Sequence, residues 1–75
     1  MAIASIIVEI ENNAMEQVLP ALGKVPGISV FGVKNNQIVT VVEGETLGSV
    51  SEIIKKLSEF DKVTGVYPVY AGDYE

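Results

Sequence analysis

Few side chains in this sequence could take part in catalysis. It has no histidine and no cysteine, and all five of its basic residues are lysines. The usual general base, the soft metal ligands and the guanidinium clamp for oxyanions are therefore absent. We expect no enzymatic activity and no tightly bound cofactor.

Carboxylates are the most abundant chemical groups that remain. Glu9 alternates with Glu11, and Glu43 with Glu45, near the ends of β-branched runs. Such pairs can bind metals or act in acid-base chemistry, but at strand ends they are usually solvated charges. Ten acidic residues against five lysines give a net charge of -5. This balance argues against nucleic acid and favours a partner that supplies arginines.

Length and composition predict one soluble domain over residues 1–75. Hydrophobic residues make up 48% of the chain, and its apolar runs are far shorter than the roughly 20 residues of a membrane span. We therefore expect no membrane insertion. The N-terminal residues 1–8 lack the Lys or Arg of a secretory signal, which predicts a cytoplasmic location.

Four stretches have the composition of β-strands. Residues 37–43 are rich in β-branched residues on both parities, which predicts a central strand, and residues 2–10 form a similar run. Residues 28–34 read as an edge strand joined to 37–43 by a type I′ turn at Asn35 and Asn36. A last strand from Val63 to about Tyr70 contains Pro68, which favours an edge position.

Two stretches have helical periodicity. The first carries apolar residues from Met15 to Leu22, with an N-cap expected at Asn12 or Asn13 and a C-cap at Gly23. Pro20 removes a helical hydrogen bond and predicts a kink or a distorted start of this helix. The second carries Val50, Ile53, Ile54 and Leu57, is extended by Phe60, and has a capping-box spacing from Ser49 to Glu52.

The two halves of the chain match as tandem strand-helix-strand units. This pattern predicts an α+β fold of the ferredoxin-like β-α-β-β-α-β type, with an antiparallel sheet in the order 4-1-3-2. The fold is a two-layer sandwich in which both helices cover one face of the sheet. The other face has no helix over it.

The turn at Asn35 and Asn36 would pair Val30 with Val41 and so divide the strand residues between two faces. The polar residues Thr40 and Ser29 favour the set to which they belong as the outer one. On the first strand, the parity of Glu9 fits the opposite choice. Which residues of that strand point outward is therefore left undecided. The outer set predicted on this basis is Ile6, Val8, Phe31, Val33, Ile38, Thr40 and Val42, with Glu9 and Glu43 at its rim.

An aliphatic outer face indicates an interaction surface. One hypothesis is a platform for an apolar peptide flanked by basic residues, and the alternative is self-association as a weak homodimer. An RNA-binding platform fits poorly, because only Phe31 and the tyrosines could stack on bases and the background is acidic.

Four segments together resemble one known family. Residues 5–8, 25–28, 37–43 and 63–66 are similar to those of the NapD-type assembly chaperones of periplasmic nitrate reductase. The resemblance implies a cytoplasmic protein with a ferredoxin-like fold. Its sheet would bind the twin-arginine (Tat) signal peptide of the nitrate reductase catalytic subunit, a molybdoenzyme, and restrain export until the molybdenum cofactor is in place. Glu9 and Glu43 would then meet the two arginines.

The C-terminal residues 66–75 depart from the Leu-Val-Tyr-His type of ending in that family. They resemble instead the Gly-Asp-Tyr-Asp segment of Lrp/AsnC regulators, where it follows the second strand. The alternative function is therefore a stand-alone amino-acid-binding regulatory domain.

Overall fold

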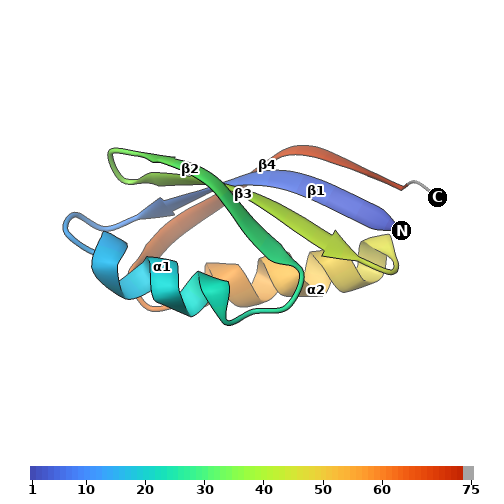
Figure 1. Cartoon of the computed structure of the whole chain (residues 1–75), viewed down its shortest axis with the longest axis horizontal. Helices are drawn as coiled ribbons and strands as arrows, with labels where there is room; N and C mark the ends of the chain where they lie inside the picture. The colour runs from blue at the N-terminus through green and yellow to red at the C-terminus, as the bar shows by residue number, and fades with distance from the viewer. Residues whose placement is uncertain (74–75) are drawn as a thin grey trace.

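A computed structural model describes residues 1–73, which form a four-stranded antiparallel sheet and two helices (Figure 1). Residues 74 and 75, the end of the Gly-Asp-Tyr-Glu segment, lie outside the described residues. In chain order, the elements are β1 (Ala2–Ile10), α1 (Met15–Gly23), β2 (Ile28–Lys34), β3 (Gln37–Gly44), α2 (Leu47–Ser58) and β4 (Val63–Asp73).

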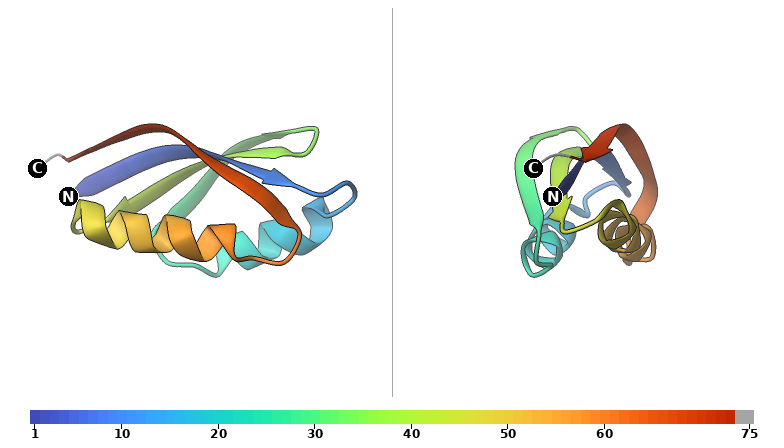
Figure 2. Two further views of the ribbon diagram at one scale, coloured as in Figure 1. Left: turned by 180° about the vertical axis from the view of Figure 1, so that it is seen from behind. Right: turned by 90° about the vertical axis from the view of Figure 1, so that its right-hand side faces the viewer.

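The strands lie in the order β2-β3-β1-β4. This is the predicted order 4-1-3-2 read from the other edge, so the ferredoxin-like prediction is confirmed. Pro68 lies in β4, an edge strand, as its missing N–H predicted. Both helices cover the same face, and within residues 1–73 no helix lies on the opposite face of the twisted sheet (Figure 2).

The core lies between the sheet and the helices. Every second residue of β1 is buried, and β3 and both helices supply the rest of the core. The fully or almost fully buried apolar residues are Ala2, Ala4, Ile6, Val8, Ile10, Ala14, Val18, Leu22, Ile38, Val42, Val50 and Leu57. Burying each large aliphatic side chain contributes roughly 1.5–3 kcal/mol. Most of the stability therefore comes from this face of the sheet.

The predicted outward parity is wrong. Ile6, Val8, Ile38, Thr40 and Val42 all face the helices and are 0% exposed. The cause is the charge on Glu9 and Glu43, which share the opposite parity and must reach water. Thr40 tolerates burial because its hydroxyl donates to the carbonyl oxygen of Ile38 at 3.4 Å.

The hairpin between β2 and β3 explains part of this error. Lys34 pairs with Gln37 as predicted, but a bulge between Val30 and Gly32 leaves Phe31 unpaired. Val30 therefore lies opposite Thr40 and not Val41. The bulge changes which β2 residues share a face.

The turn itself also differs from the prediction, because only Asn35 has a positive φ, 55°. A type I′ turn requires positive φ at both central residues, so Asn36 does not meet its geometry.

The helix boundaries differ from the predicted caps. The N-cap of α1 is Ala14, which makes no side-chain capping bond, while Asn13 has a left-handed φ of 63°. Gly23 lies inside α1, and Lys24 is its C-cap. The N-cap of α2 is Thr46, whose hydroxyl accepts from the Ser49 N–H at 3.0 Å. The predicted caps at Asn12 or Asn13, at Gly23 and at Ser49 are therefore wrong.

Candidate functional site

The uncovered face of the sheet, called the outer face below, is built from four rows of side chains that cross the strands. The register of the strands defines each row. From β4 across to β2, the rows are Gly65-Glu9-Gln37-Lys34, Tyr67-Ile7-Val39-Gly32, Tyr70-Ser5-Val41-Ser29 and, from β4 to β3 only, Gly72-Ile3-Glu43.

Apart from two serines and one glycine, the residues of the two middle rows form an apolar and aromatic strip. Ile7 and Val41 are half-buried, and Val39 is exposed. Tyr67 and Tyr70 remain 51% and 61% exposed. Contiguous apolar surface of this kind is characteristic of interaction sites. The outer face therefore has the composition of a docking surface.

Two tyrosine rings of β4 lie over glycines of the same strand. A Cβ placed on Gly65 would lie 2.5 Å from the Tyr67 hydroxyl oxygen, and one placed on Gly72 would lie 2.5 Å from that of Tyr70. The rings therefore occupy the space that side chains at these two positions would fill, as aromatic residues do beside glycines at sheet edges. They lean in opposite directions along β4, each toward one end row.

The carboxylates of Glu9 and Glu43 stand at opposite ends of the outer face. Glu43 pairs with Ile3, six residues before Glu9 on β1, which is roughly 20 Å at about 3.3 Å per strand residue. Adjacent residues of a partner are only about 3.8 Å apart at their Cα atoms. Two neighbouring arginines would therefore lie together at one end.

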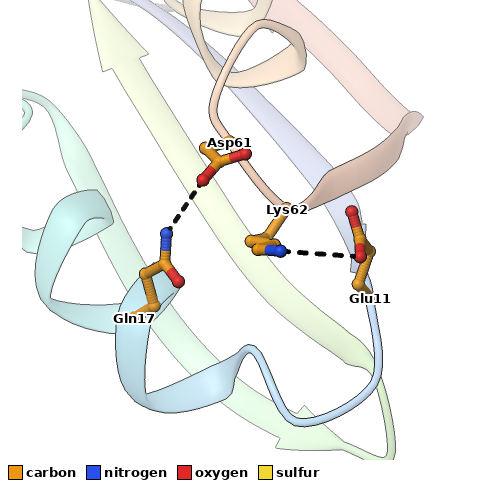
Figure 3. A network of polar contacts seen from close by, with 4 residues as sticks. All are labelled: Glu11, Gln17, Asp61 and Lys62. Atoms are coloured by element: carbon orange, nitrogen blue, oxygen red, sulfur yellow. Dashed lines mark hydrogen bonds and ion pairs between the residues drawn. The ribbon is translucent and has the colours of Figure 1, made fainter.

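A network of polar contacts holds the loops beside the Glu9 end (Figure 3). Lys62 Nζ lies 3.9 Å from Glu11 Oε1, and Gln17 Nε2 donates to Asp61 Oδ2 at 3.2 Å. The Glu11 N–H also donates to the carbonyl oxygen of Lys62 at 2.9 Å. These contacts tie the end of β1 and helix α1 to the start of β4.

The described part of the chain contains no group of three or more carboxylates, histidines or cysteines placed to hold a metal ion. The residues of the outer face offer apolar contact, aromatic stacking and carboxylate recognition of cations.

Comparison with known proteins identifies the family. The family described as NapD protein matches residues 1–73. This chain belongs to the NapD family. No curated protein matches the sequence. The match confirms the resemblance to the NapD family found in the sequence.

A solved structure has the same fold as this NapD-family protein. It is the solution structure of the E. coli Tat proofreading chaperone protein NapD, with a TM-score of 0.86 and 23% sequence identity. The alignment covers 97% of this chain and 79% of the E. coli chain. At this identity the likeness concerns the fold. No helix within residues 1–73 is long and apolar enough to span a membrane.

The structure separates the residues predicted for the NapD-type site into three groups. Glu9 and Glu43 lie on the outer face. Phe31 is 73% exposed but lies at the bulge of β2, and Val33 lies opposite buried Ile38 near the hairpin end. The remaining five, Ile6, Val8, Ile38, Thr40 and Val42, form part of the core.

The sequence prediction missed the six large apolar and aromatic residues of the outer face: Ile3, Ile7, Val39, Val41, Tyr67 and Tyr70. The available signal was the parity of the two glutamates. A charged residue must point to water, and Ile3 and Ile7 share the parity of Glu9 and so lie on the same side of β1. The small residues Ala2 and Ala4 share the other parity, as expected for a face that helices approach closely.

Proposed function

We propose that this protein is an assembly chaperone for a periplasmic nitrate reductase. In this proposal its outer face binds the Tat signal peptide of the catalytic subunit in the cytoplasm and restrains export until the molybdenum cofactor is in place. Family membership and the fold shared with a Tat proofreading chaperone support the proposal. The observation that carries it is the apolar and aromatic strip with one carboxylate at each end.

The chemistry of a twin-arginine leader complements this surface. Its apolar segment would cover Ile7, Val39 and Val41, which have no helix over them. Its arginines would meet carboxylates on a chain that carries no arginine itself. Each charge-assisted hydrogen bond contributes roughly 1.5–3 kcal/mol when shielded and less than about 1 kcal/mol at an exposed rim. Apolar contact is therefore the larger part of the expected affinity.

Calorimetric titration of a synthetic leader peptide into the protein tests the proposal. Binding should show a negative heat-capacity change, and it should weaken as salt is added. Val41→Asp should abolish binding while leaving the fold intact. Ser51→Asp is the matched control, because it adds the same charge at an exposed position of α2 and should leave the affinity unchanged.

Three outcomes of this titration would contradict the proposal. They are no binding of the leader, equal binding of a scrambled basic peptide, and equal loss of affinity in the Ser51 control. Sedimentation velocity addresses the alternative hypothesis, since self-association through the outer face predicts a dimer that Val41→Asp dissociates.

A further inference from the structure

We propose that Glu9 and Tyr67 together form a guanidinium-binding subsite, and that this subsite fixes the direction in which the peptide lies on the outer face. The inference rests on the proposed function above and adds a residue pair and an orientation to it. The arginine pair lies at the Glu9 end, and the apolar segment runs from there across the middle rows toward Tyr70 and Ile3.

The register brings the two side chains together. Gly65 of β4 pairs directly with Glu9 of β1, and directly opposed Cβ positions in a sheet lie roughly 4.5–5.5 Å apart. The hydroxyl oxygen and ring atoms of Tyr67 lie 2.5–2.9 Å from the point where a Cβ on Gly65 would stand. The phenol therefore lies beside the Glu9 side chain on the same face, where a cation can contact an aromatic ring and a carboxylate at once.

At this end of the outer face, no lysine of the described residues forms an ion pair with Glu9. Within residues 1–73, Glu11 has Lys62 as its ion-pair partner, whereas the Glu9 carboxylate has no hydrogen bond or ion pair. Lys34 lies in the same row, but Gln37 separates it from Glu9, and two strand spacings amount to roughly 10 Å. A cation on Glu9 would therefore come from a partner.

Arginine fits this subsite better than lysine does. A guanidinium is planar, so one of its faces can stack on the Tyr67 ring while its edge donates two parallel hydrogen bonds to the carboxylate. An ammonium is a compact, strongly hydrated charge and cannot make both contacts with the same geometry. The subsite therefore selects arginine.

The opposite end of the outer face lacks this arrangement. The Tyr70 ring lies over Gly72, and Gly72 pairs with Ile3. Glu43 lies on the far side of Ile3, so an aliphatic side chain separates the ring from the carboxylate. Of the two ends, only the Glu9 end has a tyrosine ring adjacent to a carboxylate. The two ends therefore differ, and a bound peptide has a preferred orientation.

The first test compares two leader peptides, one with the arginine pair and one with glutamines in its place. The measured quantity is the ratio of their affinities, which cancels losses of apolar contact common to both. Glu9→Gln and Tyr67→Leu should each lower this ratio roughly five- to tenfold, the size expected for a partly shielded ion pair or cation–π contact. The matched controls Glu43→Gln and Tyr70→Leu should change it less than about twofold. An equal fall in the ratio for the Glu43 variant would overturn the inference.

The second test uses the unmodified protein. A nitroxide placed next to the arginine pair of the bound peptide should broaden the amide signals of Glu9 and Gly65 and leave those of Gly44 and Gly72 sharp. Broadening at Gly44 and Gly72 with normal binding would overturn the orientation while the proposed function stands. Absence of any leader binding would overturn both.

Discussion

The two faces of the sheet use the same strands and similar β-branched residues, yet they have different roles. On the inner face, Ile6, Ile38 and their neighbours are completely covered by α1 and α2. On the outer face, Ile7 and Val39 lie on the same side of the sheet as Glu9 and Glu43, and no helix of the described residues covers them. A single charged residue near each strand end therefore distinguishes the face that stabilises the protein from the face left for a partner.

The largest expected effect comes from a charge placed on each face in turn. Ile38→Asp puts a carboxylate into a fully buried site and should cost about 3–5 kcal/mol, which is most of the stability of a domain of this size. Val39→Asp, the neighbouring residue, points to the exposed outer face and should leave the protein folded. Urea denaturation followed by circular dichroism measures both. Equal destabilisation by the two variants would contradict the assignment of the faces.

Gly27 supports the edge of the sheet and should give the next largest effect. Its φ is +88°, and a Cβ there would meet the carbonyl oxygen of Glu43. Gly27→Ala should therefore destabilise the protein by about 1–3 kcal/mol through backbone strain and the clash. Gly23→Ala is the matched control, since Gly23 lies in α1 with nothing within 4 Å of a Cβ. It should be neutral or stabilising by up to about 1 kcal/mol. Thermal melts of both variants measure these changes, and equal melting temperatures for the two would contradict the role of Gly27.

Thr46 caps the helix that covers the inner face. Removing its hydroxyl in Thr46→Ala leaves the Ser49 N–H without its acceptor and should cost about 1 kcal/mol. Peptide affinity should not change, because the cap lies on the helical side of the molecule. Ser51→Ala, at an exposed site in the same helix, should stay within about 0.5 kcal/mol of the parent. A loss of peptide affinity in Thr46→Ala would contradict the assignment of stability to the inner face and of peptide binding to the outer face.

The smallest effect is expected at Glu11, two residues from Glu9. Its ion pair with Lys62 spans 3.9 Å between side chains that are 42% and 54% exposed, so Glu11→Gln should cost less than about 0.5 kcal/mol. Its effect on leader affinity should be far smaller than that of Glu9→Gln. Parallel calorimetric titrations at low salt compare the two variants. Equal losses would mean that the surface responds to net charge and not to Glu9 itself.

The topology was predictable because several independent signals agreed. The tandem repeat, the turn at Asn35 and Asn36, and Pro68 at an edge all indicated the order 4-1-3-2, and the structure has it. The bounds of β2 also match the prediction of residues 28–34. The helix caps were harder to predict, because Thr46 and Ser49 lie one turn apart and both can accept a capping hydrogen bond.

The candidate site was less predictable, for a physical reason. Valine and isoleucine occupy both parities of β1 and β3, so hydrophobicity alone does not distinguish their faces. The hydroxyl of Thr40 suggested exposure, but it is satisfied locally by Ile38. The position of the β4 tyrosines on the outer face follows only from the strand register, which places Tyr67 beside Ile7 and Gly65 beside Glu9. That information is not contained in the sequence of β4 alone.

Methyl NMR of the complex with a twin-arginine leader tests the central claim most directly. With isoleucine and valine methyl groups labelled and the peptide unlabelled, intermolecular NOEs should come from Ile7, Val39 and Val41. Their neighbours Ile6, Val8 and Ile38 should show none, because they are buried beneath the helices. Contacts with the peptide are therefore expected at alternate residues along β1 and β3. Intermolecular NOEs confined to methyl groups of α1 and α2 would contradict it.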